Sequence, residues 1–95
     1  MINDEFNDFI ISDRYLGESQ TIASKGQATW SISINNHPGY TPISVTCEGT
    51  QDRLVFPRYI SFESSVYVGV GLTNMDTTSR AAYPAIRVFF IKNLE

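Results

Sequence analysis

A chain of 95 residues, 42% hydrophobic and 13% aromatic, has the length and composition of one globular domain, residues 1–95. The net charge of −3 arises in the first 18 residues, because residues 19–95 balance five acidic side chains against six basic ones. Without a basic face, a long apolar run or a signal peptide, we expect no nucleic-acid partner, no membrane insertion and no export.

The acidic N-terminal segment has two competing interpretations. Ile2, Phe6 and Phe9 lie near a helical stripe, with Asn3 or Asp4 available as a cap, so a short N-terminal helix or a disordered lead is expected first. Residues 9–16 ("FIISDRYL") also fit a strand, which we favour for that stretch. The structure of residues 1–16 therefore stays open at this point.

Two alternating strands and a turn follow. Residues 27–34 ("QATWSISI") alternate apolar and polar side chains and are expected to turn Trp30 and Ile32 toward a core. Residues 35–39 ("NNHPG") are turn formers. Residues 40–49 alternate again, and we expect one buried face of Ile43, Val45 and Cys47. Pro42, which lacks an N–H, belongs at the strand start or on a sheet edge.

The C-terminal half continues in the same style. Residues 53–63 form an expected strand in which Pro57 marks an edge or a bulge, and residues 65–74 ("SVYVGVGLTN") form the next. Residues 75–84 are expected to be a polar loop, and residues 85–92 ("AIRVFFIK") are apolar on both faces, as in an interior strand. Such a pattern predicts an all-β fold, an antiparallel β-sandwich of the jelly-roll or immunoglobulin-like kind with about seven to eight short strands.

Gly69 and Gly71 need an explanation, because each interior glycine costs a strand about 0.5–1 kcal/mol relative to alanine. A dinucleotide-binding turn is excluded, since Asn74 stands where the third glycine would be and no helix is expected to follow. The gap on this strand face could be filled by packing within the chain, with Phe89 as our candidate, by another subunit or by a ligand. The candidate interface residues are Tyr67, Gly69, Gly71 and Phe89.

Catalytic and metal chemistry find little support in the sequence. His37, the only histidine, is expected to be a solvated turn residue, and Cys47, the only cysteine, a buried apolar side chain. Neither a disulfide within the chain nor a Cys/His metal site is expected. The later carboxylates fall at turns or strand ends, where solvated acids are ordinary, so we assign no catalytic residue, metal or cofactor. These carboxylates include Glu48, Asp52, Glu63 and Asp76.

Sugar recognition is the binding chemistry that the tyrosines favour. Tyrosine rings beside Asn and Asp side chains offer both an apolar surface and hydrogen-bonding groups, whereas Trp30 lies on an apolar strand face and is expected in the core. The densest such cluster is the loop from Asn74 to Tyr83. The candidate ligand-binding residues are Asn74, Asp76, Arg80, Tyr83 and Tyr59.

Four segments carry a family resemblance: "TIASKGQATWSISI", the corner Gly39-Tyr40-Thr41-Pro42, "VYVGVGLTN" and the closing "VFFIK" of residues 88–92. With them, residues 20–92 resemble the small C-terminal β-sandwich of tail-fibre, baseplate and receptor-binding proteins of tailed phages and prophages. The resemblance implies a non-enzymatic, often trimeric domain at the tip of a fibre. It also implies a host cell-surface glycan and other virion proteins as partners, and a place in the virion after synthesis in the host cytoplasm.

Two hypotheses of different classes remain open. The first is a receptor-binding or tail-fibre tip that forms a homotrimer and contacts host glycan. The second is a purely structural virion component, such as a capsid decoration or a fibre-joining domain. A carbohydrate-active enzyme fragment is a remote third.

Overall fold

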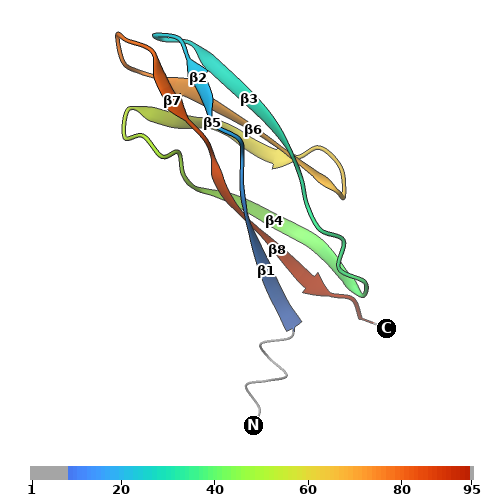
Figure 1. Cartoon of the computed structure of the whole chain (residues 1–95). Coiled ribbons are helices and arrows are strands. Elements are labelled where there is room, and N and C mark those ends of the chain that lie inside the picture. Colours follow the sequence, from blue (N-terminus) through green and yellow to red (C-terminus); the bar gives the residue numbers. More distant parts are fainter. Residues whose placement is uncertain (1–8, 95) are drawn as a thin grey trace.

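The computed structural model describes residues 9–94, and every element from Ile10 onward is a strand (Figure 1). This agrees with the predicted all-β class and with the predicted strand count. The strands are β1 (Ile10–Leu16), β2 (Gln20–Ile22), β3 (Gln27–Ser33), β4 (Tyr40–Gly49), β5 (Val55–Phe62), β6 (Tyr67–Asn74), β7 (Arg80–Ala82) and β8 (Ala85–Lys92).

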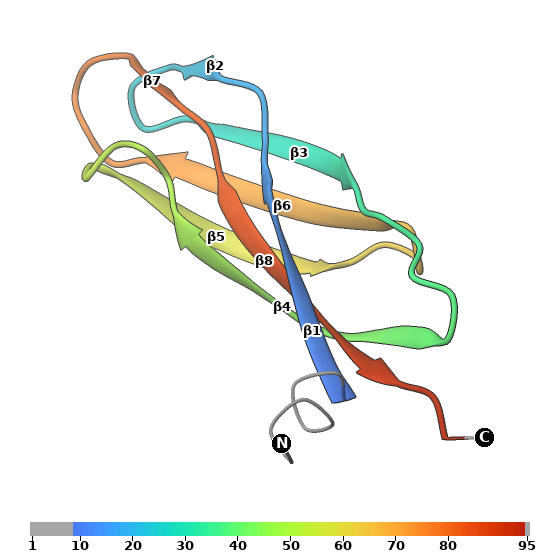
Figure 2. The ribbon, with the colours of Figure 1, turned by 60° about the horizontal axis from the view of Figure 1, so that its bottom comes forward.

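The strands form three small antiparallel sheets, in the orders β1-β8-β4, β3-β6-β5 and β2-β7. Of these pairs, only β5-β6 joins strands that follow one another in the sequence. The last strand, β8, lies between the first strand and the fourth. Figures 1 and 2 show β7 running directly into β8, so that the β2-β7 pair lies beyond the end of β1-β8 that is farther from the C-terminus.

One buried cluster draws on all three sheets. β6 contributes Val68, Val70 and Leu72, each 0% exposed, and β8 contributes alternate residues from Ile86 to Phe90. Full burial of such a side chain stabilises the fold by about 1.5–3 kcal/mol. The cluster also includes Ile22, Trp30, Ile32, Ile34, Val55 and Ala82. The expected core positions of Trp30 and Ile32 are therefore confirmed.

Several expectations about single strands are also confirmed. Residues 10–16 form β1, as favoured, and β8 is the predicted interior strand. β5 is an edge strand whose register shifts between Pro57 and Tyr59, which is the bulge predicted at the proline. The alternative of an N-terminal helix before β1 falls on residues 1–8, outside the described range.

Other expectations are corrected. The register of β4 shifts between Pro42 and Ser44, and Ile43, which lies in this irregularity, is 48% exposed instead of buried. A bulge inserts one extra residue, so the alternation predicted through Ile43 fails there. The segment expected to be a polar loop, residues 75–84, contains the short strand β7, which pairs with β2. Among residues 9–94, no helix is long and apolar enough to cross a membrane.

Candidate functional site

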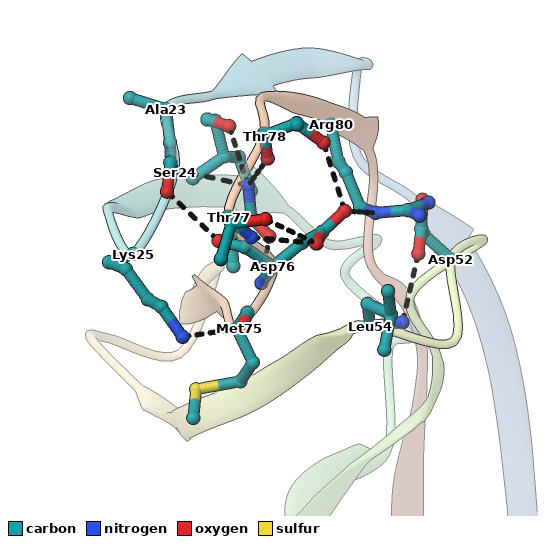
Figure 3. Close-up of polar contacts among 12 residues, drawn as sticks. Ala23, Ser24, Lys25, Asp52, Leu54, Met75, Asp76, Thr77, Thr78 and Arg80 are labelled. Carbon is teal, nitrogen blue, oxygen red and sulfur yellow. Dashed lines mark hydrogen bonds and ion pairs between the residues drawn. The ribbon is translucent and has the colours of Figure 1, made fainter.

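Three loops gather at the end of the molecule farther from the C-terminus: residues 23–26, 50–54 and 75–79 (Figure 1). We call them the tip loops. They connect β2 to β3, β4 to β5 and β6 to β7, and a network of hydrogen bonds joins them (Figure 3). This network contains three of the five predicted ligand-binding residues, so the predicted cluster is partly assembled.

Asn74, at the end of β6, is the buried centre of this network. Its side chain is 0% exposed, and Nδ2 donates to the carbonyl oxygens of Ile22 (2.9 Å), Ala23 (3.2 Å) and Thr78 (2.9 Å). Its Oδ1 accepts the backbone N–H of Asp76 at 2.8 Å. A buried amide with these four partners connects loops and has no surface to offer a ligand. Asn74 is therefore a structural residue in this fold, and its expected role as a ligand contact is a correction.

Arg80 joins two carboxylates from different loops. Its Nε donates to Asp76 Oδ2 at 2.8 Å, and Nη1 donates to Asp52 Oδ2 at 2.7 Å. Asp52 also accepts the backbone N–H of Leu54 at 2.9 Å, which fixes the loop before β5. The sequence predicts Asp52 to be an ordinary solvated carboxylate. Nothing in the neighbouring sequence indicates its ion pair with Arg80, which lies 28 positions later.

The charges of this cluster are set by the same contacts. The hydrogen bond from Arg80, with help from Thr77 and Thr78, lowers the pKa of Asp76 to about 2. The Leu54 N–H and then Arg80 lower the pKa of Asp52. These contacts favour the ionised form of both acids, and an ionised carboxylate cannot donate a proton, so neither acid suits general acid catalysis near neutral pH. Among residues 9–94, no group of three or more His, Cys, Asp or Glu side chains could hold a metal ion.

The two predicted tyrosines lie at different places. Tyr83 reaches the loop before β5, where its hydroxyl donates to Gln51 Oε1 at 2.8 Å, next to the pair formed by Asp52. Tyr59 lies instead in the middle of β5, opposite Gly71. The structure therefore brings four of the five predicted residues to the tip loops, Asn74, Asp76, Arg80 and Tyr83, and places Tyr59 on the sheet.

The outward side of β3-β6-β5 at Gly69 and Gly71 forms a second candidate site, which we call the glycine face. A methyl group on Gly71 would lie 2.7 Å from Tyr59 Cδ2, and one on Gly69 would lie 2.7 Å from Glu63 Oε2. Both distances are far inside van der Waals contact. The Tyr59 ring leaves no room for a side chain on Gly71, whereas the exposed Glu63 side chain is flexible and could move away from a methyl group on Gly69. Packing within the chain, one of the three explanations considered, therefore accounts for Gly71.

The prediction that Phe89 fills this gap is wrong, because Tyr59 and Glu63 lie over the two glycines. Phe89 lies on β8 in the other three-stranded sheet, between Ser12 of β1 and Ser44 of β4. It alternates with the buried Val88 and Phe90, so its side chain is on the opposite side of that sheet from the core. The sequence pattern correctly predicted the gap but not the strand that covers it. Of the candidate interface residues, Phe89 is thus separated from Tyr67, Gly69 and Gly71 on β6.

Two isolated residues are also placed. His37, expected in solvent, has a side chain only 29% exposed; its Nε2 lies 2.6 Å from Asp13 Oδ2, and its ring packs edge-on against Phe90 at 4.7 Å between centroids. The hydrogen bond to His37 lowers the pKa of Asp13. Cys47 is partly buried, and burial raises the pKa of its thiol, which argues against a reactive nucleophile.

Comparisons with known proteins add no relative. No protein family matches the sequence, no curated protein matches it, and no solved structure matches the fold.

Proposed function

We propose that this chain is a non-enzymatic domain of a tailed-phage or prophage particle that contacts host cell-surface glycan at a tail-fibre or receptor-binding tip. The proposal starts from the sequence resemblance described above. The observation that gives it a site is the pairing of an exposed tyrosine ring with a carboxylate on the glycine face.

The glycine face offers the two kinds of group that a sugar needs. The Tyr59 side chain is 40% exposed although its ring approaches Gly71, and the guanidinium of Arg58 lies over the ring, 5.4 Å from its centroid. A sugar that reaches this ring would therefore meet Arg58 as well. Glu63 lies over the neighbouring glycine, and its Oε1 accepts a hydrogen bond from Ser31 Oγ at 2.6 Å. An aromatic ring can stack on the C–H face of a sugar, and a carboxylate can accept bonds from its hydroxyls.

Neighbouring side chains extend this surface. Thr29 and Ser31 of β3 stand opposite Gly71 and Gly69, and both are exposed. Small hydroxyl side chains beside a ring leave room for a flat ligand and supply further donors. Phe56 and Tyr67 also have exposed side chains. Tyr67 and Thr73 lie on the same face of β6 as Gly69 and Gly71, and Phe56 pairs with Thr73. Both exposed rings therefore lie along the same outward face.

Two structural proposals accompany the function. We infer that β1-β8-β4 and β3-β6-β5 are the two layers of an antiparallel β-sandwich, since their buried side chains belong to one cluster. We also infer a homotrimer, as the family resemblance implies. Sedimentation of the chain at micromolar concentration tests the trimer, and a monomer would contradict it.

The glycan proposal is tested by screening the whole chain against an array of bacterial surface polysaccharides. On any glycan bound, Tyr59→Ala is expected to weaken binding by about tenfold or more, while Tyr59→Phe retains the ring and most of the affinity. Ile43→Ala is the control, because Ile43 is an apolar residue at least as exposed as Tyr59 but lies on β4 in the other three-stranded sheet. Binding that is insensitive to Tyr59→Ala would contradict the site.

The alternative of a purely structural virion component makes the opposite prediction. The glycan array would then be blank, while the domain would still bind defined virion proteins such as fibre or capsid subunits. In that case Tyr59→Ala would change neither result.

A further inference from the structure

β3 has one long edge that no other strand of residues 9–94 covers. It pairs only with β6, and the bonds from Ile34 N to Val66 O and from Asn74 N to Gly26 O fix which backbone groups face that partner. In an antiparallel pair these groups alternate along the strand. The even-numbered residues of β3 therefore bond to β6, and the N–H and C=O groups of Ser31 and Ser33 point away from it.

Both ends of this edge are closed by side chains. Gln20 Nε2 donates to Thr29 O at 2.9 Å, and Asn35 N donates to the hydroxyl oxygen of Tyr15 at 2.9 Å. Between these two bonds, Ser31 and Ser33 have no further backbone partner within residues 9–94. Four backbone groups, two donors and two acceptors, thus remain in a row.

A cleft of about 540 Å³ lies against this row. Its walls come from the end of β1, the segment after it and β3, with Tyr15, Leu16, Trp30 and Ile32 among the lining residues. Because Gly17 N donates to Pro84 O, the alternation in β1 turns the N–H and C=O of Leu16 away from β8. A peptide in the cleft would therefore meet the backbone groups of Leu16 on one side and those of Ser31 and Ser33 on the other. The cleft volume is within the usual range for ligand sites.

The β3 edge also lacks the features that normally discourage strand addition. The other edge of the same sheet, β5, carries Pro57, a bulge and Arg58, whereas β3 has no proline, bulge or basic residue. The charged groups beside the β3 edge are carboxylates: Glu18 lines the cleft, and Glu63 bonds to Ser31 Oγ. Among the residues that the structure describes, no basic side chain lines the cleft. This charge favours a basic occupant.

We propose that the edge of β3 at Ser31 and Ser33 binds an extended peptide segment of a partner protein that carries a Lys or Arg side chain, by addition of a strand. Backbone hydrogen bonds to the two serines hold the segment, the cleft receives its inward side chains, and Glu18 and Glu63 attract its positive charge. The site is separate from the tip loops; it shares Ser31 and Glu63 with the glycine face but does not require that a glycan binds there.

The test uses the whole chain and a positional library of capped heptapeptides of Thr and Val whose central residue is Lys, Arg, Glu or Thr. Titration calorimetry should detect binding of Lys and Arg peptides with a dissociation constant below about 1 mM, and about tenfold weaker binding of the Glu peptides. N-methylation of alternate residues should abolish binding, because it removes the donors that a ladder needs.

Ser33→Pro is the decisive variant, since it removes an N–H that points away from β6 and leaves the pairing with β6 intact. It should weaken peptide binding by about tenfold or more, while Ser33→Ala, which keeps the N–H, should not. An unchanged circular dichroism spectrum shows that the variant folds. Ile43→Ala, on β4 in the other three-stranded sheet, should leave peptide binding unchanged.

Three results would overturn the proposal. They are the absence of binding across the library at about 1 mM peptide, unchanged binding to Ser33→Pro, and equal binding of N-methylated peptides. A dimer of the chain that Ser33→Pro converts to monomers would also overturn it, because the occupant would then be a second copy.

Discussion

The buried amide of Asn74 connects β6 to two other segments, and its removal should destabilise the whole domain. Asn74→Ala deletes the two N–H donors that Nδ2 shares among three carbonyl oxygens, and one accepted bond. The bond to Ile22 O is buried, whereas water can partly reach the others. Since an unsatisfied buried group costs about 1–3 kcal/mol, the free energy of unfolding should fall by about 2–4 kcal/mol. That is a large part of the about 5–15 kcal/mol that holds a typical domain.

Urea unfolding measures this loss, with the fluorescence of Trp30 as the signal, because the only tryptophan is 8% exposed in the folded state. With a urea slope of about 1–3 kcal/mol per molar, the midpoint should fall by about 0.7–4 M. Asn36→Ala is the matched control: Asn36 is exposed in the turn before β4, so its replacement should change stability by less than about 0.5 kcal/mol.

A second variant separates the hydrogen bonds from the loss of volume. Asn74→Asp keeps the size but turns a carboxylate toward three carbonyl oxygens, which raises the pKa of the new acid in the folded state. The folded variant then binds a proton more tightly than the unfolded one, so its stability should rise as the pH falls. The reasoning would be refuted if Asn74→Ala cost less than about 1 kcal/mol, or if Asn74→Asp matched the wild type at neutral pH.

Three further predictions concern other parts of the molecule. Gly71→Val should push away the Tyr59 ring and cost about 1–3 kcal/mol of unfolding free energy in urea titrations, and an unchanged midpoint would contradict the packing. Above its usual pKa of 3.8, the ionised Asp76 stabilises the fold, and this contribution is lost as the pH falls through about 2. Arg80→Gln should therefore lower the melting temperature more at pH 7 than at pH 2. Equal decreases at the two pH values would count against the stabilising role of the Arg80–Asp76 pair. The Cys47 thiol should react with a disulfide reagent more slowly in the folded than in the urea-unfolded chain, and equal rates would exclude its burial.

The strands could be predicted from the sequence because apolar alternation is a local property. In β3 and β6 every second side chain faces the core, and the register pairs these faces directly, Trp30 with Val70 and Ile32 with Val68. The same alternation showed that Gly69 and Gly71 leave the opposite face of β6 without side chains. These features depend only on neighbouring residues in the chain.

The partners across the fold could not be predicted in this way. His37 bonds to Asp13, 24 positions earlier, and Arg80 bonds to Asp52, 28 positions earlier, and neither pair has a spacing that signals contact. Ile43 was expected in the core because a bulge cannot be seen in an alternating pattern that continues on both sides of it. Which strand covers the glycines depends on sheet order, which local sequence leaves undetermined.

The central position of β8 has a consequence for how the protein is made. β8 is the last strand of the described residues, yet it lies between β1 and β4, and within residues 9–94 neither of those strands has another partner in its sheet. During translation β1 and β4 cannot form this sheet until β8 has left the ribosome. A nascent chain stalled before residue 85 would therefore hold two strands without their partner.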